Sequence, residues 1–217
     1  MTRKSKSSKG EQMNPDQYIQ KRARQLPLFE CLVSPGWEVD RQPAVIVSRK
    51  HTNGNITACL YVVDLLCLGV IFTTHVFNVS EEEYKELVLK IFEDSEQAPS
   101  NPDDIPAEPF ERIPYNLAHN IIYAGYEYAA DFDIPPHKDF RVTKYMLEED
   151  NEEIALMDID CGHNGKPLFV TENLTEYSAF KPEFIIKKLN QHAGEGNYEV
   201  ISSLDLMDPE DDEFDED

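Results

Sequence analysis

The sequence contains no apolar run long enough to cross a membrane. Its most apolar segment, ITACLYVVDLLCLGVIF, falls short of the roughly 18 residues of a spanning helix and carries Asp64 inside it, which favours buried strand. The basic N-terminus is followed by no apolar core of a secretory signal. Cysteine is scarce too, and the four thiols, Cys31, Cys59, Cys67 and Cys161, form no CxxC pair, a pattern typical of reduced cysteines. We therefore expect a cytoplasmic protein without a membrane-spanning segment.

The usual catalytic signatures are missing as well. The chain has no HExxH zinc motif, no GxSxG nucleophile elbow, no Walker phosphate loop and no paired CxxC motif. At 217 residues the chain is long enough to bury a core without a structural metal or a disulfide. The sequence thus predicts no cofactor, and a catalytic site would have to be built from scattered residues.

Basic residues are few in relation to acidic ones. The chain carries 42 acids against 20 bases, a net charge of −22 at pH 7. Residues 1–24 hold seven bases and two acids, residues 205–217 hold nine acids and no base, and residues 25–204 have a net charge of −18. A body this negative repels nucleic-acid phosphates, so direct DNA binding by the folded domain is not expected. The expected macromolecular partner is a basic protein or a ribonucleoprotein.

Composition divides the chain into three parts. Residues 1–24 form a basic arm, disordered at its start and ending in a short helix with Asn14 as its N-cap and Pro15 as its first residue. Residues 25–201 form one globular domain. Residues 202–217 form an acidic tail that is expected to be disordered, because it has too little to bury.

Strand signals dominate the first half of the domain. Asn53-Gly54 lies between two β-branched runs, which predicts a hairpin over residues 44–63 closed by a type I′ turn with positive φ at both residues. Gly69 suggests a bulge or a close backbone approach before a third strand over residues 70–76. Further strands are expected in the segments IALMDID, PLFVT and NYEVIS.

Helix signals are equally clear. In NVSEEEYKELVLKIFED, Ser80 and Glu83 are spaced as a capping box, and apolar residues follow at helical spacing. A longer helix is predicted over residues 115–132, where Gly125 is expected to permit close packing against another element. A short helix near FRVTKYM and one over residues 181–193 complete the set. The predicted fold is α+β: a single domain with an antiparallel or mixed sheet of about five strands, packed by three or four helices.

The candidate catalytic residues are a scattered set of acids, histidines and one thiol. They are Asp64, Cys67, His119, His137 and Asp139. A histidine beside a thiol can lower its pKa and activate it as a nucleophile, and carboxylates can orient the histidine. Prolines in IPPHKDF end the long helix and fix His137 and Asp139 on its exit loop. The alternative for His119 is a histidine whose hydrogen bonds are satisfied within the domain, or one that lies at an interface.

Two further candidates concern metal and partner binding. Cys161 and His163 in DIDCGHNGKP supply only half of a zinc site, and the alternative is a simple hairpin turn at HNGK. In the acidic tail, apolar residues stand among carboxylates, so the tail is either a solubilising segment or a motif that anchors on a basic, apolar groove. The tail residues predicted to bind a partner are Leu206, Asp211, Asp212, Glu213 and Phe214.

Four segments of the chain resemble an uncharacterised bacterial domain family. They are YVVDLLCLGV (61–70), LAHNIIYAGYEYAADFDIPPHKDF (117–140), NGKPLFV (164–170) and GEGNYEVI (194–201), which match family patterns of the type YLVDxxCLGV, LAHxIIYGGxEYAxxxGFxPHxDF, GKPLYV and GxGNYxxI. The resemblance covers about residues 27–201. It implies that the family-defining positions are Asp64, Cys67, Gly69, His119, Glu127, His137, Asp139 and Lys166-Pro167. It transfers no activity, and because some members lack the equivalent of His119, Asp64 and Asp139 are the stronger candidates.

The leading hypothesis is a non-enzymatic interaction protein that binds a basic macromolecular partner through its acidic surface and tail. The alternative is a hydrolase or nuclease-like enzyme with a Cys/His/Asp or metal site. A second alternative is an immunity or inhibitor protein that mimics the charge of nucleic acid. The last differs from the first only in its partner.

Overall fold

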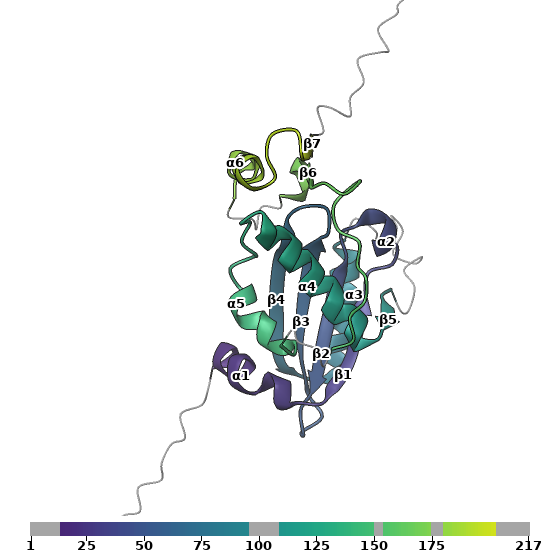
Figure 1. The fold of residues 1–217 in the computed structure, drawn as a ribbon. Helices are drawn as coiled ribbons and strands as arrows, with labels where there is room; N and C mark the ends of the chain where they lie inside the picture. The colour runs from purple at the N-terminus through teal and green to yellow at the C-terminus, as the bar shows by residue number, and fades with distance from the viewer. Residues whose placement is uncertain (1–13, 96–108, 150–153, 175–179, 203–217) are drawn as a thin grey trace, which may run out of the picture.

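The computed structural model describes residues 14–95, 109–149, 154–174 and 180–202, and its centre is a five-stranded antiparallel sheet (Figure 1). The strands lie in the order β4-β3-β2-β1-β5. Their bounds are β1 Leu28–Val33, β2 Ala44–Lys50, β3 Ile56–Asp64, β4 Gly69–Val79 and β5 Glu111–Ile113. A separate two-stranded parallel sheet pairs β6, Leu168–Val170, with β7, Glu199–Ile201. The predicted α+β single domain is confirmed.

Helices cover both faces of the large sheet. They are α1 Pro15–Arg22, α2 Trp37–Asp40, α3 Glu81–Glu93, α4 Tyr115–Asp131, α5 Phe140–Thr143 and α6 Pro182–His192, with 3-10 turns η1 Ala23–Gln25, η3 Lys144–Met146 and η4 Thr171–Asn173. Alternate strand residues point to opposite faces, so Val45 and Val47 pack in one core with α4, whereas Ile46 packs in another with α3. Within the described ranges, no helix is both long and apolar enough to span a bilayer.

The predicted β2–β3 hairpin is confirmed, but its turn differs from the predicted type I′. The Gly54 N–H donates to the His51 carbonyl at 3.0 Å, and the His51 N–H donates to the Asn55 carbonyl at 2.7 Å. Gly54 has φ of +89°, whereas Asn53 is not among the positive-φ residues. The loop therefore has three residues with a left-handed glycine last, which leaves Asn53 in an ordinary conformation.

A turn with positive φ at both central residues occurs instead at HNGK. Asn164 and Gly165 have φ of +51° and +76°, and His163 and Lys166 exchange backbone hydrogen bonds of 2.7 and 3.0 Å.

Residues 154–160 form no strand, contrary to the prediction for IALMDID. The Asn120 side chain satisfies their backbone instead, because it accepts from the Met157 N–H and donates to the Ala155 carbonyl, both at 3.0 Å.

The N-terminal helix packs on the domain. Asn14 caps α1 by accepting a hydrogen bond from the Gln17 N–H at 2.8 Å, as predicted. Ile19 and Ala23 are fully buried in the core that also contains α4. Residues 15–24, which composition placed in the basic arm, therefore contribute to the globular core. The Ser80 and Glu83 capping box on α3 is confirmed.

Candidate functional site

Asp64 ends strand β3 and organises the turn into β4. Its Oδ1 accepts hydrogen bonds from the backbone N–H groups of Leu66, Cys67 and Leu68, at 2.9, 2.7 and 3.2 Å. Its Oδ2 accepts one from the Asn173 side chain at 2.6 Å. Burial raises the pKa of the Asp64 carboxyl, although these four hydrogen bonds oppose the shift. Both carboxylate oxygens are thus engaged, Oδ1 in holding the β3–β4 turn and Oδ2 in linking that turn to η4.

Cys67 lies in the same turn with its thiol buried. It packs in an apolar cluster with Ile185 and Leu189 of α6. Burial raises the pKa of the Cys67 thiol, and the nearby Asp64 carboxylate raises it further. Since the thiolate is the nucleophilic form of cysteine, this environment is the opposite of one that activates a catalytic thiol.

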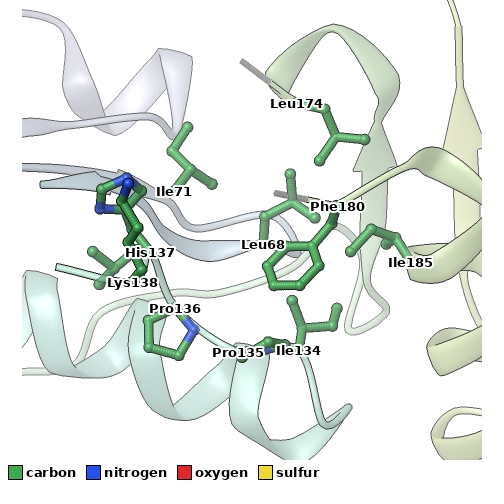
Figure 2. A pocket seen from close by; sticks show the side chains of 11 residues that line it. Leu68, Ile71, Ile134, Pro135, Pro136, His137, Lys138, Leu174, Phe180 and Ile185 are labelled. Carbon is green, nitrogen blue, oxygen red and sulfur yellow. The ribbon is translucent and has the colours of Figure 1, made fainter. Parts of the chain in front are cut away.

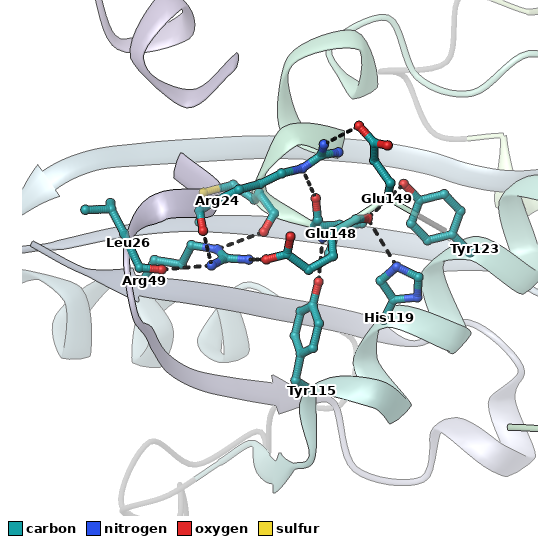
Figure 3. Close-up of polar contacts among 10 residues, drawn as sticks. Arg24, Leu26, Arg49, Tyr115, His119, Tyr123, Glu148 and Glu149 are labelled. Carbon is teal, nitrogen blue, oxygen red and sulfur yellow. Dashed lines mark hydrogen bonds and ion pairs between the residues drawn. The ribbon is translucent and has the colours of Figure 1, made fainter. Parts of the chain in front are cut away.

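His119 is a buried residue in the first half of α4, and only 1% of its surface is exposed. Its ring stacks on Tyr123 with the ring centroids 4.5 Å apart, and Tyr115 meets it edge-on at 5.8 Å. Its Nε2 lies 3.3 Å from the carbonyl oxygen of Glu148 (Figure 3). These contacts are those of the structural alternative, a buried histidine with a hydrogen-bonding partner.

A buried arginine stands beside this histidine and was not predicted from the sequence. Arg49 is 3% exposed and donates through Nε to the Met146 carbonyl at 2.9 Å. Its two terminal nitrogens donate to the carbonyls of Arg24 and Leu26, at 3.3 and 2.8 Å, and to the Glu148 carboxylate at 2.8 Å (Figure 3). Arg49 therefore fastens the chain after α5 to the N-terminal segment, which is a structural role.

His137 and Asp139 do lie together on the loop that leaves α4. The His137 N–H donates to the Val70 carbonyl at 2.8 Å, which fixes the loop against the start of β4. Nδ1 of His137 accepts from the Asp139 N–H at 3.4 Å. Burial lowers the pKa of His137, Lys138 lowers it further, and Asp139 opposes the shift. The loop is positioned as predicted, but the hydrogen bond from Asp139 to the His137 ring comes from the Asp139 backbone N–H and not from its carboxylate.

This loop forms one wall of an apolar pocket of about 180 Å³. Ile134, Pro135 and Pro136 face Phe180 and Ile185 across it, with Leu68 and Ile71 at its base and Leu174 beside them (Figure 2). His137 and Lys138 stand at one end. The lining is suited to an apolar group rather than to hydrolytic chemistry, which needs convergent polar side chains.

The five candidate catalytic residues occupy three separate places. Asp64 and Cys67 share the β3–β4 turn, and the start of β4 abuts α4 at Gly125. His119 lies six residues earlier on α4, about 9 Å along the helix axis. His137 and Asp139 belong to the exit loop. In the parts of the chain that the structure describes, no group of three or more His, Cys, Asp or Glu side chains is placed to hold a metal ion.

Among the described residues, Cys161 and His163 belong to no group of side chains that could hold a metal ion. Burial raises the pKa of the half-buried Cys161 thiol to about 11. His163 is exposed, and its Nδ1 lies 3.3 Å from the Glu199 carboxylate. Together with the HNGK turn, these contacts match the alternative of a simple hairpin.

A second hollow lies on the face of the sheet opposite α4, where α3 covers the strands only in part. It is a groove of about 1000 Å³. Its floor is formed by apolar side chains of β2, β3 and β4, and its wall by the apolar stripe of α3. These residues are Ala44, Ile46, Ala58, Leu60, Val62, Phe72, Val76, Tyr84, Leu87, Val88 and Ile91. Several of them are only half-buried, so the groove presents apolar surface to a partner.

Two acidic side chains line this groove. The carboxylates of Asp40 and Asp94 line it, and no lysine or arginine does so among the described residues. On the outer side of α3, Glu82, Glu86 and Glu93 are exposed together with Lys85 and Lys90, so that side of the helix has mixed charge. The groove thus joins an apolar floor to a rim that carries two carboxylates and no described lysine or arginine.

There is a specific reason why the groove was not predicted from the sequence. Strands β2 and β3 are apolar on both faces, a pattern that indicates two covered faces without showing how much of each is covered. The predicted partner-binding residues of the tail, Leu206, Asp211, Asp212, Glu213 and Phe214, lie outside the described residues.

We compared the chain with models of known protein families, with curated proteins and with solved structures, and none of the three comparisons found a match. The resemblance to the uncharacterised bacterial family therefore stays a prediction.

Proposed function

We propose that this chain is a non-enzymatic interaction protein that binds a basic, amphipathic segment of a macromolecular partner in the groove between α3 and the sheet. The observation that carries the proposal is the pairing of an apolar floor with a rim that holds Asp40 and Asp94 and no described lysine or arginine. A partner segment with apolar anchors and flanking lysine or arginine complements both features.

The arrangement of the other candidate residues supports an interaction role over a catalytic one. Asp64 uses one carboxylate oxygen in a turn and the other to accept from Asn173, the Cys67 thiol is buried with a raised pKa, and His119 is packed between tyrosines. A hydrolase or nuclease-like reaction would need these groups to converge on one substrate. We place the protein in the cytoplasm, because all four of its cysteines are free.

The net charge of −22 is expected to raise the rate at which a basic partner associates. An excess of acids attracts a basic partner over distances of about the Debye length, roughly 10 Å at 0.1 M salt. The apolar floor would then set the dissociation rate, because desolvated contacts determine how long a complex lasts. The acidic tail adds to the attraction in the same way.

The experiment is a fluorescence-anisotropy titration of the full chain with a labelled amphipathic peptide of leucine and lysine, and with its leucine and glutamate counterpart. We expect the basic peptide to bind at about 50 mM salt and to weaken at least about tenfold at about 500 mM, where charges are screened. The acidic peptide is expected not to bind. Equal binding of both peptides would contradict the proposal.

Two matched variants localise the binding. Thr74→Lys introduces a base at an exposed position that lines the groove, and Thr52→Lys introduces the same charge at the exposed tip of the β2–β3 hairpin. Thr74→Lys is expected to weaken the basic peptide about tenfold or more, whereas Thr52→Lys should change its affinity only slightly. If the two variants weaken binding equally, the peptide is held by net charge and not by the groove.

A further inference from the structure

The pocket beside the exit loop is built to hold one apolar group. Its lining is largely buried: Leu68, Ile71, Ile134 and Ile185 are each less than 8% exposed. Cavities of about 150 Å³ lined by leucine, isoleucine and phenylalanine accept benzene, so the volume of about 180 Å³ here has room for a phenyl ring.

The wall of this pocket is already rigid. Pro135 and Pro136 restrict the backbone of the exit loop, and the hydrogen bond of 2.8 Å from His137 to the Val70 carbonyl fastens it to the sheet. A preformed wall lowers the entropy cost of binding, because little has to be ordered when the pocket is filled.

Basic side chains lie in or next to segments that line the pocket, in a protein that is otherwise strongly acidic. Lys138 lines it, Lys181 follows the lining residue Phe180, and Arg141 and Lys144 lie on the helical turns that continue from the loop. All four are exposed, and none forms an ion pair with another described residue. The acids nearest to Lys138 and Lys181 in sequence are Asp139, which follows Lys138 directly, and Glu183, two residues after Lys181. The pocket therefore suits an aromatic or aliphatic group flanked by carboxylates.

The chain itself contains such a segment. Phe214 is the only aromatic residue of the acidic tail, with Asp211, Asp212 and Glu213 before it and Asp215, Glu216 and Asp217 after it. It follows Ser202, the last described residue, by twelve positions. An extended chain of that length spans about 40 Å, which is comparable to the diameter of a domain of this size.

We propose that the acidic tail docks on its own domain, with the Phe214 ring in the pocket between the exit loop and α6 and the flanking carboxylates facing Lys138, Lys181 and Arg141. This contact is intramolecular and does not depend on the proposed groove partner. It assigns the IPPHKDF loop a role as the wall of a binding site. It also pairs carboxylates of the tail with bases that form no ion pair with another described residue.

The test uses methyl NMR of the full chain with isotope-labelled isoleucine δ1-methyl groups. In Phe214→Ala, the signals of Ile71, Ile134 and Ile185 should shift, while those of Ile46 and Ile121, which lie outside the pocket, should stay in place. Raising the salt from about 50 to about 500 mM should move the wild-type pocket signals toward their positions in the variant. Unchanged pocket signals in Phe214→Ala would overturn the proposal.

Charge variants and alternative occupants sharpen the result. Lys138→Glu should shift the pocket signals toward those of Phe214→Ala, whereas Lys90→Glu on α3 should not. Tyr177 lies in the sequence between the lining residues Leu174 and Phe180. If Tyr177→Ala shifts the pocket signals and Phe214→Ala does not, the segment that contains Tyr177 fills the pocket and the proposal is wrong. If the shifts depend on protein concentration, the tail of a second copy fills the pocket, and intramolecular docking is wrong.

Discussion

A β-carbon built on Gly69 would lie 2.7 Å from the carbonyl oxygen of Gly125. The two glycines thus bring the start of β4 into direct contact with the backbone of α4. A β-carbon on Gly125 would collide with the side chain of Val63, which is fully buried on β3. The close packing predicted for Gly125 is confirmed, and it holds the turn formed by Asp64 against the helix.

Replacing this helical glycine should destabilise the protein. Gly125→Ala gains up to about 1 kcal/mol of helix propensity, but overpacking against Val63 costs about 1–3 kcal/mol, so we expect a net loss of about 1–2 kcal/mol. Urea denaturation monitored by circular dichroism measures it. Ala130→Gly, at an exposed site on the same helix, should lose about 1 kcal/mol through propensity alone. A stabilised Gly125→Ala would show that the contact is not tight.

Arg49→Lys should lower the free energy of unfolding far more than the replacement of an exposed arginine by lysine does. The guanidinium of Arg49 serves three carbonyl oxygens and the Glu148 carboxylate at once, and an ammonium group cannot match that geometry. Leaving buried acceptors unpaired predicts a loss of about 3 kcal/mol in the free energy of unfolding. Arg141→Lys, at an exposed position, should stay within about 0.5 kcal/mol. Equal stability of the two variants would refute the role assigned to Arg49.

The thiols should react in an order set by burial. Cys67 is buried with a raised pKa, so a thiol-specific reagent should leave it unmodified in the native protein and modify it only after urea unfolding. Cys161, the one half-buried cysteine, should react first, and Cys161→Ser should remove that fraction. Fast labelling of native Cys67 would instead revive the hydrolase hypothesis.

His137 should make the stability depend on pH. Burial lowers its pKa below the ordinary value of 6.5, so the unfolded chain binds more protons near that pH than the folded protein. Its contribution is therefore present above pH 6.5 and is lost as the pH falls through the lowered pKa. The stability of the wild type relative to His137→Gln should decrease from about pH 7.5 to about pH 5.5 in urea titrations. If the relative stability of the wild type instead increased as the pH fell over that range, the pKa of His137 would be raised and not lowered.

Much of the fold could be predicted because its signals are local. The Ser80 and Glu83 capping box, the Asn14 cap and the Asn53-Gly54 hairpin each depend on a few neighbouring residues. Strands β1 and β5 were missed, and β5 is only three residues long within a proline-rich stretch. Its pairing with β1 is a long-range contact that no local pattern encodes.

The candidate site was harder to predict, because burial and convergence decide it. Asp64 and Cys67 were chosen for their chemistry, but their roles follow from the turn they share and from the α6 cluster around the thiol. The exit loop with His137 was singled out for its prolines, and the structure adds the hydrogen bond that fastens it to Val70. The groove could not be predicted, because α3 covers only part of a sheet face whose side chains are mostly apolar.

The measurement that tests the central claim most directly is the footprint of the basic amphipathic peptide on the full chain. In methyl NMR, the signals of Leu60 and Val62 on the groove floor should shift as the leucine and lysine peptide is added, and the leucine and glutamate peptide should leave them unchanged. The methyl signal of Ile121, buried on the opposite face of the sheet, is the internal control. Saturable binding of the basic peptide with no shift at Leu60 or Val62 would contradict the account.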